Sequence, residues 1–265
     1  VSPSSVKQDL ARRDFTINAM AVRLTPGPAV VMDPFGGRAD LARRQLRVLH
    51  PLSFVEDPTR ILRGARLAGR LSFEFAGDTA AKARAVVEEG LSGGVSRSRL
   101  RAELELTFAE QRVLPSLEVM ERLGVLRPLF GLELAGAREL VAALDEARSK
   151  GDVPEEAYLL ALLAALPEPA AAEHVEAFNW PRRVLAARDR VLRLRSRPGE
   201  ATDAELEQLS PAEAAVLRAG GGPHGLPVAV CTFSGHSHAC HVCEHDNHDH
   251  TRFQSHHKGG IRLPQ

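Results

Sequence analysis

The sequence predicts a mainly α-helical protein of the α+β class, with a small mixed part at its start and a long helical part after it. Alanine, leucine, arginine and glutamate dominate, and aromatic residues make up only 5%, which favours helix over sheet. Near the start, two short apolar runs flank a Pro/Gly turn, a pattern typical of paired strands. Over residues 57–219 the apolar residues recur with helical spacing.

The bulk composition limits the classes of protein that need to be considered. The chain has 265 residues, 44% of them hydrophobic, which suffices for one large domain or two to three small ones. Lys+Arg and Asp+Glu both number 34, so any signal for a polyanionic partner must be local. The sequence contains no apolar run long enough to span a membrane, and its start does not resemble a signal peptide. All three cysteines follow residue 230, which favours a reducing, cytoplasmic setting.

The first predicted elements are two strands, at residues 19–24 and 29–32, joined by the Pro/Gly turn. Residues 36–49 then indicate a loop, a short helix and a strand. In the helical region that follows, turn signals at residues 92–94, 151–154, 166–167 and 197–199 separate helices of ordinary length. We therefore expect four parts: 1–50, 51–110, 111–222 and a His-rich, disordered tail at 223–265.

The segment FVEDPTRILRGARLAGR, residues 54–70, predicts a helix with a defined start. Asp57 is a preferred N-cap residue, and proline is tolerated at the first helical position, here Pro58. The residues expected to face a core are Ile61, Ala65 and Ala68. The arginines fall within an arc of about 120° on another side of the helix: Arg60, Arg63, Arg66 and Arg70.

Two interpretations of this arginine arc remain open on physical grounds alone. It fits an ordinary solvated helix face with an acidic cap. It also fits a stripe facing a polyanion, with Asp57 and Arg60 at its tip. An arginine fork beside an acceptor carboxylate can hydrogen-bond the edge of a nucleotide base.

Three segments in order decide between these interpretations: RRDFTINAMA (residues 12–21), DPFGGRADLARRQLRVL (33–49) and FVEDPTRILRGARLAGRLSFEF (54–75). Together they resemble the class II tRNA nucleotidyltransferases, the CCA-adding enzymes, and the related bacterial poly(A) polymerases. VSRSRLRAELELTF (95–108) and VMERLGVLRPLF (119–130) are similar to the family's next helical motif and the start of its helical body. The resemblance covers residues 8–130 specifically and 131–219 loosely.

The resemblance implies a set of nucleotide-binding residues, with a role for most of them. Arg63 belongs to this set without a separate role. Arg13 and Asp14 match the family pair that lies near the ribose, whose 2′-hydroxyl both donates and accepts hydrogen bonds. Asn18 matches a residue that contacts the phosphates. Asp57 and Arg60 match the pair that replaces a template base, and Glu56 the residue that orients the arginine. Residues 33–37 resemble the segment that joins the family's head to its neck, where Gly36 and Gly37 would let the backbone flex.

The resemblance also implies that the helical body binds the backbone of the tRNA acceptor arm. The arginines at the far end of the arc, Arg66 and Arg70, face either this RNA or water. A later segment, residues 180–197, contains seven arginines and one acid. Such density favours salt-dependent phosphate contact by Arg182, Arg183 and Arg193, although a solvated helix with buried arginine stems fits equally well.

The implied activity is template-independent addition of CMP or AMP, from CTP and ATP, to the 3′ end of tRNA, with Mg²⁺ as cofactor. The motifs do not separate CCA addition from CC-only addition, A-only addition or poly(A) synthesis. A different class of function is a non-catalytic RNA-binding protein that keeps the neck and body. We expect no membrane partner, because no apolar run is long enough to span a membrane.

The family's metal-binding carboxylates have no match in this sequence. In the family they form an Asp-x-Asp pair well upstream of the first segment, whereas only 11 residues precede Arg12 and no Asp-x-Asp occurs anywhere. Glu103-x-Glu105 has that spacing, but its side chains should diverge on a helix. We therefore expect a catalytically incomplete chain: a truncated product, a fragment completed by a second chain, or a degenerate relative. A start at Val1 rather than methionine favours truncation.

The tail combines Cys240-x-x-Cys243 with most of the histidines, and these are side-chain types that zinc prefers. Few apolar residues accompany them, so a folded zinc module lacks material for a core. A disordered low-complexity extension or a frame-shifted read-through fits the composition better. We predict no specific metal site there.

Overall fold

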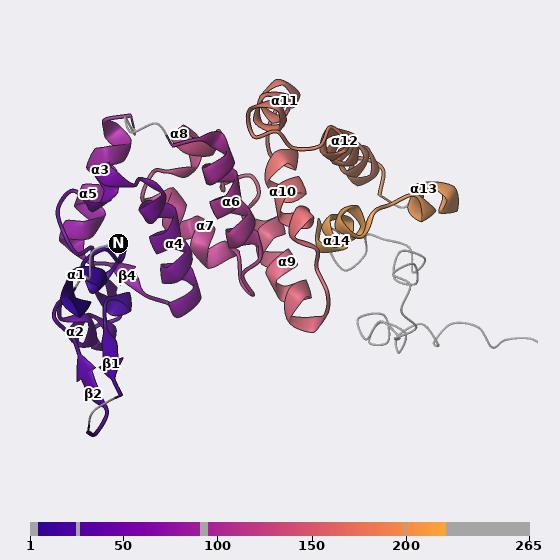
Figure 1. Cartoon of the computed structure of the whole chain (residues 1–265). Helices are drawn as coiled ribbons and strands as arrows, with labels where there is room; N and C mark the ends of the chain where they lie inside the picture. Colours follow the sequence, from indigo (N-terminus) through magenta and orange to yellow (C-terminus); the bar gives the residue numbers. More distant parts are fainter. Residues whose placement is uncertain (1–4, 25–26, 91–94, 199, 221–265) are drawn as a thin grey trace, which may run out of the picture.

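A computed structural model of the protein describes residues 5–24, 27–90, 95–198 and 200–220. Its helices follow one another along an elongated molecule, with a small α/β part at one end and α12 to α14 at the other (Figure 1). The mainly helical prediction is confirmed. The His-rich tail with Cys240 and Cys243 lies outside the described residues, as does the predicted turn at 92–94.

The α/β part contains the predicted pair of strands. β1 (Ala21–Arg23) pairs antiparallel with β2 (Val30–Met32), with Ala21 opposite Met32. Short helical elements flank the hairpin: α1 (Val6–Leu10), η1 (Thr16–Asn18) and α2 (Gly37–Ala42). The predicted short helix and strand within residues 36–49 are therefore present, the strand being β3 (Gln45–Leu46).

A second, two-stranded sheet was not predicted. β3 pairs in parallel with β4 (Glu74–Phe75), which lies inside the region expected to be wholly helical. The chain leaves the preceding helix at Ser72, whose left-handed φ of 55° ends the helix. The ring of Phe75 then packs edge-on against Phe15 at 6.2 Å. This contact brings the chain after α4 back onto the α/β part.

The remaining elements of the described residues are helices separated by short connections. Four of them precede residue 110: α3 (Ser53–Glu56), α4 (Thr59–Leu71), α5 (Gly77–Glu88) and α6 (Arg97–Phe108). Eight follow: α7 (Leu114–Arg122), α8 (Leu126–Phe130), α9 (Arg138–Lys150), α10 (Glu155–Ala164), α11 (Glu168–Ala177), α12 (Arg183–Arg195), α13 (Asp203–Glu207) and α14 (Pro211–Gly220). The predicted breaks at residues 151–154 and 166–167 fall between α9 and α10 and between α10 and α11.

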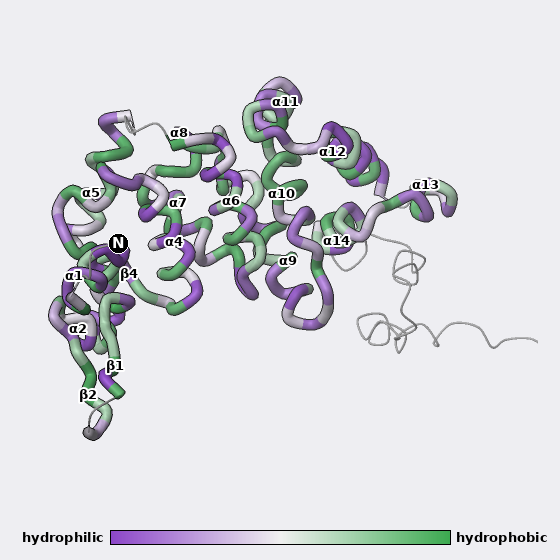
Figure 2. Tube along the Cα trace, in the orientation of Figure 1, coloured by the Kyte–Doolittle hydropathy of each residue, from purple (hydrophilic) through white to green (hydrophobic). Residues whose placement is uncertain are grey.

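One apolar cluster runs through the molecule from Phe15 to Leu217. α4 supplies its predicted core residues, since Ile61, Ala65 and Ala68 are buried. α10 is apolar on almost every side (Figure 2), which suits its place among α6, α9, α12 and α14. Within the described ranges, no helix has both the length and the apolar character needed to cross a membrane.

Candidate functional site

Asp57 lies in the short connection between α3 and α4. The helix begins one residue later than predicted, with Pro58 at the N-cap and Thr59 as its first residue. Asp57 Oδ1 nevertheless accepts hydrogen bonds from the Thr59 backbone N–H (3.1 Å) and hydroxyl (2.6 Å). The carboxylate therefore still caps the helix start, as aspartate does at many helix N-termini.

Asp14 reaches this helix from a distant part of the sequence. Its carboxylate accepts hydrogen bonds from Arg63 Nε (2.9 Å) and Nη2 (3.1 Å), a two-pronged contact. Arg60 Nε lies 3.1 Å from Asp14 Oδ1 but is not aligned as a hydrogen bond. Three residues from the predicted nucleotide-binding set thus meet in one ion cluster.

Arg63 is the centre of this cluster. Its Nη2 also donates to Asp57 Oδ2 at 3.1 Å, so one guanidinium joins both aspartates. Burial lowers the pKa of Arg63, but the hydrogen bonds and charges of Asp14 and Asp57 outweigh burial and raise it. In Asp57, burial raises the carboxyl pKa, and the hydrogen bonds from Thr59 and Arg63 overcome this effect and lower it. Both groups are therefore charged across the physiological pH range.

Two residues of α6, absent from the predicted set, complete the cluster. Arg99 Nη2 donates to Asp57 Oδ1 at 3.0 Å. Glu103 Oε1 accepts from Arg63 Nη1 at 3.4 Å, and burial raises the pKa of the Glu103 carboxyl despite Arg63 and Arg66 nearby. Their i, i+4 spacing within the segment 95–108, which the sequence singled out, is the signal that could have identified them.

Arg60 is held by the helix before it. Its Nη1 donates to the Ser53 hydroxyl at 2.9 Å and lies 3.7 Å from Glu56 Oε2. His50 Nε2 lies 3.4 Å from the same Glu56 oxygen. The structure therefore brings Glu56 to Arg60, at the long end of ion-pair distance.

The other two predicted nucleotide ligands, Arg13 and Asn18, make no hydrogen bond or ion pair with this cluster in the described part of the chain. Arg13 is exposed and lies 3.8 Å from Asp9, within an i, i+4 pair. The side-chain oxygen of Asn18 accepts from the Phe15 backbone N–H at 3.0 Å. No partner for its NH₂ group is found among the residues that the structure describes, so those donors are available to a ligand.

The predicted flexible join at residues 36–37 is closely packed at one of its two glycines. Gly36 has a φ of 76°, which suits glycine. A Cβ on Gly37 would lie 2.2 Å from the backbone oxygen of Thr16. The Asp33 carboxylate accepts from the Gly37 (2.7 Å) and Arg38 (2.9 Å) N–H groups, and these bonds, chiefly that from Arg38, lower its pKa. Flexing at this join remains a prediction.

The far end of the arginine arc faces acidic side chains. Arg66 Nη1 donates to Glu110 Oε1 at 3.2 Å, and Arg70 Nη1 lies 3.7 Å from the same oxygen. The Arg66 side chain is 19% exposed and that of Arg70 is 53% exposed. The arc is thus neither fully solvated nor free of partners, and RNA contact by these two residues stays a prediction.

Six of the seven arginines in residues 180–197 fall into two groups. Three make contacts with backbone carbonyls or with Asp189, Glu213 and Glu205, and of these only the first is buried: Arg188, Arg190 and Arg197. The three named for RNA contact are exposed and have no ion pair with any described residue: Arg182, Arg183 and Arg193.

The acidic groups do not assemble into a metal site in the part of the chain that the structure covers. Glu103 faces Arg63 and Arg66, whereas Glu105 pairs with Arg101 at 2.8 Å, so their predicted divergence is confirmed. Asp14 and Asp57 are likewise bound to arginines. A carboxylate set neutralised by guanidinium groups does not fit Mg²⁺, which needs free oxygen ligands.

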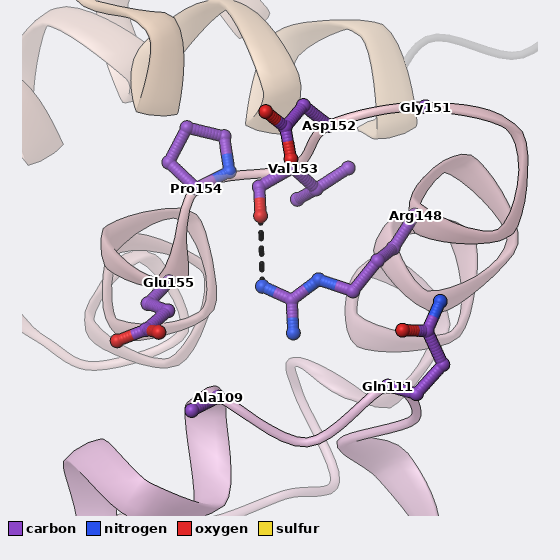
Figure 3. Close-up of a pocket in the computed structure, with 8 residues that line it drawn as sticks. All are labelled: Ala109, Gln111, Arg148, Gly151, Asp152, Val153, Pro154 and Glu155. Carbon is purple, nitrogen blue, oxygen red and sulfur yellow. Dashed lines mark hydrogen bonds between the residues drawn. The ribbon is translucent and has the colours of Figure 1, made fainter.

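A separate hollow of about 660 Å³ lies between the ends of α6, α9 and α10 (Figure 3). Arg148 projects into it and donates to the carbonyl of Val153 at 2.8 Å, and to those of Phe108 and Glu110. Its guanidinium thus satisfies carbonyls at a helix end and in two loops. The predicted site residues do not line this hollow.

Comparison with known proteins identifies the family of this chain. A family model described as the poly(A) polymerase head domain matches residues 1–47. A solved structure described as a tRNA-processing enzyme in an apo form superposes with a TM-score of 0.70 and 31% identity, covering 82% of this chain and 68% of that chain. This chain belongs to the class II tRNA nucleotidyltransferase/poly(A) polymerase family.

Family members with different products are similar to this chain. An A-adding tRNA nucleotidyltransferase of Aquifex aeolicus is 45% identical over 131 residues, which cover 49% of this chain and 16% of that protein. A CC-adding tRNA nucleotidyltransferase of Deinococcus radiodurans is 38% identical over 187 residues, covering 69% of this chain and 47% of the relative. The chain thus spans less than half the length of these curated family members.

Proposed function

We propose that this chain forms the nucleotide-recognising and RNA-holding part of an enzyme that adds CMP or AMP to the 3′ end of tRNA. The observation that carries the proposal is the cluster around Arg63. It joins Asp14 to Asp57, although Asp14 and Arg63 lie 49 positions apart in the sequence. In the proposed division, the neck spans residues 51–110 and the RNA-holding body spans 111–222.

The proposed base readers are Asp57 and Arg60. Cytosine and adenine both present an amino donor beside a ring-nitrogen acceptor on the Watson–Crick edge. A carboxylate that accepts and an arginine that donates complement this pattern, whereas uracil and guanine present a carbonyl beside an N–H. Glu56 would orient Arg60. Arg13 and Asp14 would bind the ribose 2′-hydroxyl, and the NH₂ group of Asn18 would face the phosphates.

Mg²⁺ supplies charge stabilisation and activation of the 3′-hydroxyl in this reaction class. The residues described here bind, orient and read the nucleotide instead, and arginine-paired carboxylates are unsuited to the ion. We therefore infer that the metal ligands come from another segment or from a second chain that supplies the rest of the head. The same recognition part would serve CCA, CC-only, A-only or poly(A) addition.

The test combines nucleotide binding with incorporation. We expect the chain to bind CTP and ATP at least tenfold more tightly than UTP and GTP, and Asp57→Ala to abolish this preference. With tRNA ending before its CCA, Mg²⁺ and labelled CTP or ATP, the chain alone should incorporate nothing. The exposed, surface-paired Arg127 provides the control variant Arg127→Ala. Robust incorporation would disprove the proposed incompleteness, and absence of nucleotide preference would disprove the base readers.

A further inference from the structure

α6 uses two opposite faces. Residues two apart on a helix point about 200° away from each other, so Arg99 and Glu103 lie on one side and Arg97 and Arg101 on the other. α6 itself packs between α4 and α10. Each pair of side chains contacts a different part of the molecule, and together the two pairs connect the nucleotide site with the start of α12.

The first face contacts the proposed base reader. Arg99 Nη2 lies 3.0 Å from Asp57 Oδ1 and 3.2 Å from the Thr59 hydroxyl. Glu103 is 8% exposed and holds Arg63 from the same face. The position of α6 is therefore tied to that of Asp57 by ion pairs.

The opposite face grips the turn between α11 and α12. Arg101 Nη1 donates to the carbonyls of Asn179 (2.7 Å) and Phe178 (3.3 Å). Its guanidinium carbon lies 3.9 Å from the centroid of the Trp180 ring, and Glu105 accepts from its Nε. Asn179 has a left-handed φ of 52°, so the chain turns sharply where Arg101 holds it.

The chain enters α12 directly after this turn. Arg182 and Arg183 are the first residues there, exposed and without an ion pair in the described ranges. One rigid helix thus fixes both the carboxylate of Asp57 and the first cationic side chains of α12. Two sites held at a constant separation can engage one RNA together with a neighbouring nucleotide.

We propose that Arg101 is a positioning residue: it holds the start of α12 so that an RNA bound on Arg182 and Arg183 places its 3′ end against the nucleotide at Asp57. The inference rests on the proposed function. Contact between RNA and nucleotide makes each raise the affinity for the other by the same factor. Without Arg101 the turn before α12 is held less firmly, so the 3′ end of the RNA no longer lies at a fixed position beside the nucleotide at Asp57. The factor by which each ligand raises the affinity for the other therefore falls.

The experiment measures the Kd of CTP with and without a saturating tRNA transcript that ends before its CCA. In the unchanged chain we expect RNA to tighten CTP binding about five- to 150-fold. In Arg101→Ala the Kd of CTP alone and of RNA alone should stay within about twofold, while the enhancement falls close to one. Arg101→Lys keeps the charge but not the guanidinium hydrogen bonds or the stacking on Trp180, and it should lose most of the enhancement. The control Arg127→Ala should keep the full enhancement.

The outcomes separate the positioning role from simple loss of structure. Circular dichroism and the Tm report whether each variant is folded; if Arg101→Ala is unfolded, Arg101→Lys decides. Full enhancement in a folded variant, or equal weakening of both separate affinities, overturns the positioning role. The positioning role is also overturned if the unsubstituted protein binds CTP and RNA but neither ligand raises the affinity for the other. A chain that binds neither ligand overturns the proposed function itself.

Discussion

At the residue scale, Asp14 shows how a short motif acquires its geometry. The sequence identified Asp14, Asp57, Arg60 and Arg63 by resemblance, and the structure brings them into contact. The sequence alone, however, does not reveal that Arg63 joins the two aspartates. Pairing across 49 positions depends on how α4 packs against the α/β part, and local sequence carries no information on such packing.

Gly37 offers a direct test of the packing beside this motif. In Gly37→Ala, the new Cβ would lie 2.2 Å from the Thr16 backbone oxygen, and backbone cannot move aside as a side chain can. We expect a loss of about 1–3 kcal/mol in the free energy of unfolding, measured with urea. Gly77→Ala is the matched control, because its Cβ meets open space at a helix start. Equal midpoints in the two variants would contradict the close packing.

The buried ring of His174 predicts a pH dependence. It is 4% exposed, its Nδ1 donates to the Phe130 carbonyl at 2.7 Å, and its Nε2 has no partner in the described part. Burial lowers its pKa below the ordinary 6.5, and Arg97 adds to this, against the Phe130 hydrogen bond. The unfolded chain then binds the proton more readily, so stability is present above pH 6.5 and decreases as the pH falls below it.

The variant His174→Asn isolates this contribution. Asparagine can donate to the same carbonyl but does not titrate. Urea unfolding of both proteins should show a stability difference between neutral and mildly acidic pH that is larger in the original chain. Parallel pH profiles would mean that other groups cause the dependence.

At the scale of elements, most helices were predictable and β4 was not. The apolar spacing of α4 and the turn signals around α10 are local, so sequence suffices for them. β4 has only two residues, and its formation depends on Ser72 ending α4 and on the contact of Phe75 with Phe15. The same limit applies to residues 180–197, because their sequence does not show that Glu213 pairs with Arg190 and Glu205 with Arg197.

The exposed arginines of α12 carry a prediction about RNA. Replacing Arg182, Arg183 and Arg193 with alanine should reduce the slope of log affinity against log salt by roughly two, because each phosphate contact releases counterions. Filter binding of tRNA at several salt concentrations measures the slope. The control replaces the same three with lysine, which keeps the charges and should keep the slope. An unchanged slope in the alanine variant would assign these residues to solvent.

At the scale of the whole molecule, one apolar core joins the α/β part to α14. The buried apolar cluster extends without interruption from Phe15, through α4 and α10, to Leu217. The predicted division at residue 222 follows a change in composition, whereas those at residues 50 and 110 cut through this shared core. The sequence could not show this, because each amphipathic helix reveals that it has a buried face but not which neighbour covers it.

A shared core predicts cooperative unfolding. Trp180, the only tryptophan, lies beyond α11, whereas circular dichroism reports on all helices. In urea both signals should change at one midpoint. Gly69→Ala tests the connection, since a Cβ there would lie 2.5 Å from the Ser116 backbone nitrogen, between α4 and α7 and far along the chain from Trp180. We expect it to lower both midpoints equally. If only the circular dichroism midpoint falls, the region around Trp180 unfolds independently, and α6 could not hold α12 at a fixed place.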